Sequence, residues 1–89
     1  MSLLFEVELA DGWDTHYAKL DKSEQERIWK KILQLVGPIK ARHPRFGLPF
    51  FVVETGQYRI CFEEIDRRRK IHFAGNHKQY ERWYREQEF

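Results

Sequence analysis

Residues 72–84, with the sequence HFAGNHKQYERWY, carry the side chains best suited to chemistry in this chain. His77 offers an imidazole, a group that works as a general base near neutral pH. Lys78 can balance developing phosphate charge, and Tyr80, three residues after His77 on one helical face, can donate a proton or stack on a base. Composition alone favours a second interpretation, in which His77 is exposed and the aromatic residues only dock a terminal helix.

Several arginines are candidates for binding an anion. Arg59 projects from a predicted strand, where it either pairs with Glu54 or Glu63 or holds a phosphate through two donors. A predicted turn carries a run of positive charge: Arg67, Arg68, Arg69 and Lys70. A solvated hairpin tip and an RNA contact both explain this run. The loop before the second predicted strand adds further candidates for the same anion: Arg42, His43 and Arg45.

Other classes of chemistry have little support in the residue pattern. The four histidines lack the spacing of known metal sites, so no metal is predicted. Cys61 lies in the middle of a predicted strand, where an inert thiol is usual. The five glycines form no phosphate-binding loop, so no nucleotide cofactor is predicted.

The chain has 89 residues, which predicts one domain spanning 1–89. It has no apolar run long enough for a membrane span, no signal-peptide pattern and a single cysteine, so a cytoplasmic protein is expected. Residues 1–36 hold five Lys/Arg and seven Asp/Glu, whereas residues 37–89 hold eleven and seven. The basic second part indicates an anionic partner such as nucleic acid, although a solvated surface explains it equally well.

The candidate residues must be positioned by strands and helices that the periodicity predicts. Residues 3–9 alternate as a strand, Asp11 begins a short helix, and a capping box of Ser23 and Glu26 begins a second helix that ends at Gly37-Pro38. Strands follow at 50–53, at 58–63 and around 71–73, and Asn76 caps the last helix. The predicted order is β-α-α-β-β-β-α, an α+β fold with the helices on one side of a mostly antiparallel sheet.

Two segments, GQYRICFEEID (56–66) and KIHFAGNHKQYERWY (70–84), resemble the RelE/ParE toxin superfamily, in particular its RelE-like and HigB-like branches. The resemblance implies a four-stranded twisted antiparallel sheet with a helical hairpin against it. It also implies the toxin of a type II toxin–antitoxin system, bound to a cognate antitoxin protein in a hetero-oligomer. RelE-like toxins are mRNA interferases: endoribonucleases that cut messenger RNA on the ribosome, without a metal or other cofactor, and so inhibit translation.

The resemblance also implies roles for individual residues. Arg59 matches the strand arginine that holds the scissile phosphate, and His77 matches the basic catalytic position after the last strand. Tyr80 matches the tyrosine of the Gly-x-His-x-x-Tyr pattern. Trp83 or Tyr84 lies near a C-terminal tyrosine that orients a base.

An alternative from a different class is a non-cleaving protein on the same fold, either a gyrase inhibitor or an inactive regulatory or binding module. The residues Phe50–Val53 motivate it, because some RelE-like toxins have catalytic lysines on this strand and here there is no ionisable group. A third interpretation is an interaction domain that binds only a partner protein. Three tryptophans and seven phenylalanines are many for so small a core, and a partner would cover the surplus.

Overall fold

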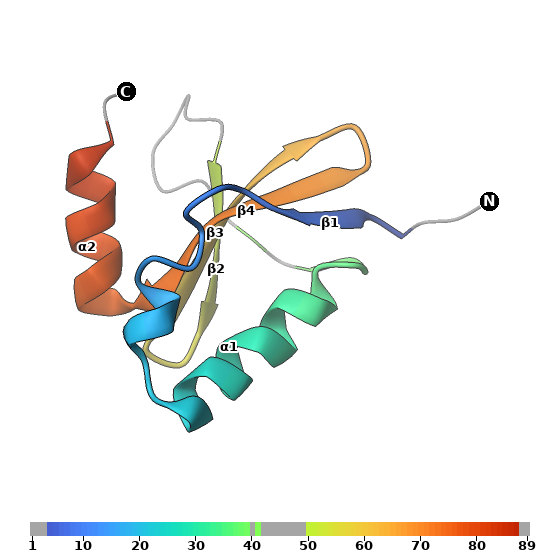
Figure 1. The fold of residues 1–89 in the computed structure, drawn as a ribbon. Helices are drawn as coiled ribbons and strands as arrows, with labels where there is room; N and C mark the ends of the chain where they lie inside the picture. The colour runs from blue at the N-terminus through green and yellow to red at the C-terminus, as the bar shows by residue number, and fades with distance from the viewer. Residues whose placement is uncertain (1–3, 40, 42–49, 88–89) are drawn as a thin grey trace.

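A computed structural model of the protein describes residues 4–39, 41 and 50–87. Its elements, in chain order, are β1 (Glu6–Leu9), the 3-10 helix η1 (Tyr17–Lys19), α1 (Lys22–Gln34), β2 (Phe50–Thr55), β3 (Tyr58–Ile65), β4 (Arg68–Asn76) and α2 (His77–Glu86) (Figure 1). The predicted α+β class is confirmed, and so is the predicted order of the four strands along the chain. In the described part of the chain, no helix has the length and apolar character needed to span a membrane.

The four strands form one mixed sheet with the order β1-β4-β3-β2. Short turns join β2 to β3 and β3 to β4, and both pairs are antiparallel as predicted. β1, however, runs parallel to β4. The sheet is therefore mostly antiparallel, as the residue pattern predicted, but it is mixed and differs from the antiparallel sheet that the resemblance implies. A long connection through η1 and α1 separates β1 from the other strands, and such a connection allows parallel pairing at the free edge of β4.

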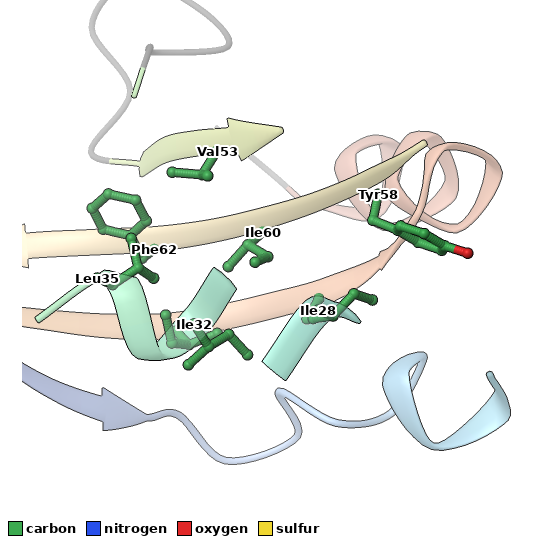
Figure 2. Packing of buried hydrophobic residues seen from close by; sticks show 9 residues of the cluster. Ile28, Ile32, Leu35, Val53, Tyr58, Ile60 and Phe62 are labelled. Carbon is green, nitrogen blue, oxygen red and sulfur yellow. The ribbon is translucent and has the colours of Figure 1, made fainter. Parts of the chain in front are cut away.

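The two α-helices cover opposite faces of the sheet (Figure 1). One face packs against α1 in a buried cluster seen in Figure 2: Ile28, Ile32, Leu35, Val53, Tyr58, Ile60, Phe62, Ile71 and Ala74. On the other face, Val52, Cys61 and Phe73 pack beneath Tyr80 and Trp83 of α2. The prediction that all helices share one side was therefore wrong. Consecutive residues of a strand point to opposite faces of the sheet. Because the side chains on both faces are apolar here, each face must pack against a helix of its own.

The predicted helical hairpin is replaced by turns, η1 and a single long helix. Gly12 has a positive φ of 79°, and the amide of Thr15 bonds back to the Gly12 carbonyl at 3.1 Å. These local turns use backbone groups that an α-helix needs, so only the three residues of η1 are helical before α1.

The N-cap of α1 is Asp21, two residues before Ser23, the N-cap of the predicted Ser23–Glu26 capping box. Asp21 accepts from the Glu24 amide at 2.8 Å, and the Glu24 carboxylate accepts from the Asp21 amide at 3.2 Å. Ser23 instead donates its hydroxyl to Asp21. Both residue pairs have capping-box spacing, and the earlier pair satisfies the first amides of the longer helix.

Candidate functional site

Arg59 lies on β3, on the sheet face that carries α2. Its side chain is only 16% exposed, and its Nε lies 3.5 Å from Glu54 Oε1 on the neighbouring strand. Its Nη1 donates to the carbonyls of Gly56 at 3.3 Å and Tyr58 at 3.1 Å. The predicted pairing with Glu54 is confirmed. These bonds hold the guanidinium near the β2–β3 turn with a restricted set of orientations.

Gly75 is the direct cross-strand neighbour of Arg59. A Cβ atom there would lie 2.6 Å from Gln79 Oε1 and 2.9 Å from Phe73 Cζ, closer than real contacts allow. The missing side chain lets the first turn of α2 pack tightly against β4. The Gly75-Asn76-His77 sequence therefore brings the start of α2 beside Arg59.

We expect Gly75→Ala to lower the free energy of unfolding by about 1–3 kcal/mol, because the added methyl must displace Gln79 or Phe73. Urea unfolding of both proteins measures the difference. Gly37→Ala is the matched control, since the described neighbour of its Cβ would be the Gln34 carbonyl at an ordinary 3.9 Å. Equal losses in the two variants would contradict the close packing of α2 on β4.

α2 begins with a complete capping box. The Asn76 side chain accepts from the Gln79 amide at 2.9 Å, and Gln79 Oε1 accepts from the Asn76 amide at 2.9 Å. The prediction that Asn76 caps this helix is confirmed. His77 and Lys78 are therefore the first two residues of α2, where the helix dipole adds partial positive charge.

His77 is about half exposed and is paired along the helix. Its Nε2 lies 3.0 Å from Glu81 Oε1, four residues later. When Nε2–H donates a hydrogen bond to Glu81, the other ring nitrogen, Nδ1, keeps its lone pair available. The neutral ring then presents one basic nitrogen away from Glu81.

Arg59, His77 and Lys78 line the same open pocket, with a volume of about 600 Å³. The other lining residues come from the start of α1, the β2–β3 turn and the end of β4: Glu24, Gly56, Gln57 and Asn76. Pockets for small ligands span about 300–1,000 Å³, so this one has room for a nucleotide. The structure thus brings together three of the residues that the sequence analysis selected.

The aromatic candidates on α2 lie outside the described lining of this pocket. Trp83 stacks on Phe73, with ring centroids 5.2 Å apart, and meets Phe50 edge-on at 5.8 Å. Tyr80 contacts Phe73 at 6.0 Å and Tyr84 at 5.8 Å. In this arrangement the aromatic face of α2 docks the helix on the sheet, which is the second interpretation offered by the sequence.

The predicted basic turn does not present three free arginines. Arg67 is exposed, but Arg68 lies 3.6 Å from Glu6 and 3.8 Å from Glu8 on β1. Arg69 is only 5% exposed and bonds to groups inside the protein. Arg69 is therefore corrected from a candidate RNA contact to a buried residue that joins β4 to α1. Arg42 and Arg45 lie outside the described residues.

Sequence reasoning missed Glu24, which is one of the residues that line the pocket. Glu24 Oε2 accepts from the Tyr58 hydroxyl at 2.7 Å across the gap between α1 and β3. This bond, together with burial, raises the pKa of the Tyr58 phenol. The Asp21-x-x-Glu24 spacing would have revealed the cap, but the contact with Tyr58 depends on the packing of α1.

His16 lies near α2 but is not a described lining residue of the pocket. Its ring is 5.4 Å from Phe73, and burial is the main cause that lowers its pKa, with Lys19 and Arg82 adding to the effect and Glu86 opposing it. A lowered pKa means that the unfolded chain binds the proton more readily, so stability is lost as pH falls through and below 6.5.

We expect His16→Gln to reduce the loss of thermal stability between pH 7.5 and pH 5 relative to the parent protein. The difference should be a modest one, below about 1 kcal/mol, because the ring is only partly buried. Parallel thermal melts at the two pH values measure it. A steeper loss of stability in the variant would show that the sign is wrong.

No protein-family model matches the sequence, and no curated protein matches it. Among the described residues, no three His, Cys, Asp or Glu side chains are grouped so that they would hold a metal ion.

Proposed function

We propose that the chain is the toxin of a type II toxin–antitoxin system, an endoribonuclease that cuts messenger RNA on the ribosome without a metal. It would act in the cytoplasm and be held inactive in a hetero-oligomer with its cognate antitoxin. The observation that carries the proposal is the shared pocket of Arg59, His77 and Lys78. The resemblance of residues 56–66 and 70–84 to the RelE/ParE superfamily supports it from the sequence.

The three side chains have the functions that RNA transesterification requires. Arg59 and Lys78 bind the non-bridging oxygens of the scissile phosphate, and the N-terminus of α2 adds positive potential. His77 removes the proton of the ribose 2′-hydroxyl, and the 2′-oxygen forms a bond to phosphorus. The bond from phosphorus to the 5′-oxygen breaks, and that oxygen takes a proton from water in the open pocket. The products are a 2′,3′-cyclic phosphate and a free 5′-hydroxyl.

Glu81 orients the imidazole of His77, the general base. It accepts from His77 Nε2 at 3.0 Å, which leaves Nδ1 to receive the proton from the 2′-hydroxyl. The imidazolium that forms is then paired with a carboxylate. The Tyr80 ring packs on Phe73, so in this proposal Tyr80 docks α2 on the sheet and does not transfer a proton.

The alternative is a non-cleaving member of the same superfamily, acting as a gyrase inhibitor or a regulatory module. It is favoured by β2, where the ionisable residue is Glu54 rather than a lysine. Glu54 partly neutralises Arg59 at 3.5 Å, so a phosphate must compete with this carboxylate. Inhibition of DNA supercoiling without RNA cleavage would favour the alternative.

Induced expression without the antitoxin tests the proposal in cells. We expect the parent chain to arrest growth, and Arg59→Gln and His77→Gln to relieve the arrest at equal protein levels. Arg85→Gln is the matched control, because Arg85 is exposed in the last turn of α2 and is not a described lining residue of the pocket. Arrest of equal strength by all four proteins would overturn the site assignment.

A further inference from the structure

The pocket lined by Arg59, His77 and Lys78 is also lined by an acidic residue, Glu24, and by Gln57 of the β2–β3 turn. Glu24 is half-buried and is held from two sides. Its Oε1 accepts from the Asp21 amide at 3.2 Å, and its Oε2 accepts from the Tyr58 hydroxyl at 2.7 Å. Tyr58 is itself 8% exposed and belongs to the core cluster shown in Figure 2. Both carboxylate oxygens therefore have fixed positions.

A carboxylate in a phosphate-binding pocket repels the phosphate, so Glu24 defines a separate part of the site. Each carboxylate oxygen has about two lone-pair directions, and Asp21 and Tyr58 use one on each oxygen. One acceptor direction therefore remains on each of two adjacent, fixed oxygens. The complementary ligand has two neighbouring N–H donors and no acceptor between them.

Among the four RNA bases, guanine alone has two neighbouring N–H donors, N1–H and the exocyclic N2 amine, on its Watson–Crick edge. Adenine and cytosine have one amine beside a ring-nitrogen acceptor, and uracil has one N–H between two carbonyl acceptors. Those acceptors would face the carboxylate and be repelled. A hydrogen-bonding site of this kind binds poorly to any base that leaves the two acceptor oxygens without donors.

We propose that Glu24 is a specificity-determining residue that selects guanine in the nucleotide whose phosphate is bound by Arg59 and Lys78. This inference rests on the proposed function, because it assumes that the pocket binds RNA. It adds a base preference that is set by α1, an element distant in sequence from both recognised segments. Gln57 lies on the same pocket wall and can contact another edge of the base.

The test is calorimetric binding of three probes: guanosine 3′-monophosphate, adenosine 3′-monophosphate and inosine 3′-monophosphate. We expect the parent protein to bind the guanosine probe at least about tenfold more tightly than the adenosine probe, as hydrogen bonds to a charged acceptor allow. Glu24→Gln should reduce this preference to less than about threefold, because the amide replaces one of the two acceptor oxygens with an NH₂ donor, which would face an N–H group of guanine. Glu26→Gln, an exposed change on the same helix, should keep the full preference.

The inosine probe tests the inference without any change to the protein. It lacks the exocyclic amine, so it should bind the parent several-fold more weakly than the guanosine probe does. The inosine and guanosine probes should bind Glu24→Gln with equal affinity. Equal binding of all three probes to the parent, or a full preference in Glu24→Gln, would overturn the role of Glu24. Arg59→Gln should weaken all probes by the same factor. Binding that ignores Arg59, or no binding at all, would overturn the proposed function as well.

Discussion

Replacing Arg69 with methionine is expected to lower the free energy of unfolding by about 3–5 kcal/mol. The guanidinium is buried, and its Nη1 donates to the carbonyls of Leu35 and Gly37, each at 2.8 Å. These carbonyls lie at the end of α1, where the helix leaves acceptors without internal partners. Methionine fills most of the volume but supplies no donor, so the carbonyls would stay buried and unpaired.

Two further contacts of Arg69 add to this loss. Its Nε lies 2.9 Å from Glu64 Oε1 on β3, and its guanidinium lies 3.6 Å from the centre of the Phe5 ring. One side chain therefore connects β4, β3, the end of α1 and the segment before β1. A domain of this size is usually stable by about 5–15 kcal/mol, so the variant would lose a large part of its stability.

Urea unfolding followed by circular dichroism measures this effect, and Arg68→Met is the matched control. Arg68 is the preceding residue on the same strand, but its side chain is 67% exposed and pairs with Glu6 and Glu8 at the surface. Exposed ion pairs contribute about 0–1 kcal/mol, so the control should stay close to the parent. Similar losses in the two variants would contradict the assigned role of Arg69.

Under the proposed function, Arg59→Gln is expected to lower the rate of RNA cleavage by about 100–1,000-fold at saturating ribosome concentration. This is the typical cost of removing one preorganised donor from charge that develops in a transition state. The side chain lies at the pocket wall, so the change should alter the reaction far more than the fold. A loss confined to the apparent affinity would mean that Arg59 only helps to bind RNA.

Arg85→Gln provides the comparison for that experiment, because Arg85 is an exposed arginine in the last turn of α2. It removes the same charge from the protein without touching the described pocket lining. Cleavage should therefore fall no more than a few-fold through weaker long-range attraction of RNA. Comparable losses in both variants would show that general charge, not the position of Arg59, determines the rate.

The sequence predicted the local features well where they depend on neighbouring residues. The Asn76 cap, the turn between β2 and β3 and the position of Arg59 beside Glu54 all follow from short-range patterns. The parallel pairing of β1 could not be predicted, because it depends on which sheet edge remains free after the other strands have paired. Periodicity identified apolar strand faces but gave no indication of which helix covers each one.

The site could be predicted only in part, because it also depends on contacts between residues that are distant in sequence. His77 and Lys78 are neighbours in sequence, and only the proposed resemblance to a toxin superfamily linked His77 to Arg59 before the structure placed them in one pocket. Glu24 lines the pocket and is held by a contact with Tyr58, 34 residues away. No local sequence pattern indicates this contact. Arg69 stands in a run of charged residues that is typical of a solvated turn. Its burial follows from the position of the α1 carbonyls and the Phe5 ring.

The central claim is that the Arg59–His77–Lys78 pocket cleaves messenger RNA, and the chemistry of the cut ends tests it most directly. A defined messenger RNA in a translating extract is incubated with the parent protein, Arg59→Gln or His77→Gln, and the new ends are analysed. We expect fragments with a 5′-hydroxyl and a 2′,3′-cyclic phosphate for the parent, and far fewer for both variants. Intact messenger RNA with the parent, or equal cutting by all three proteins, would contradict it.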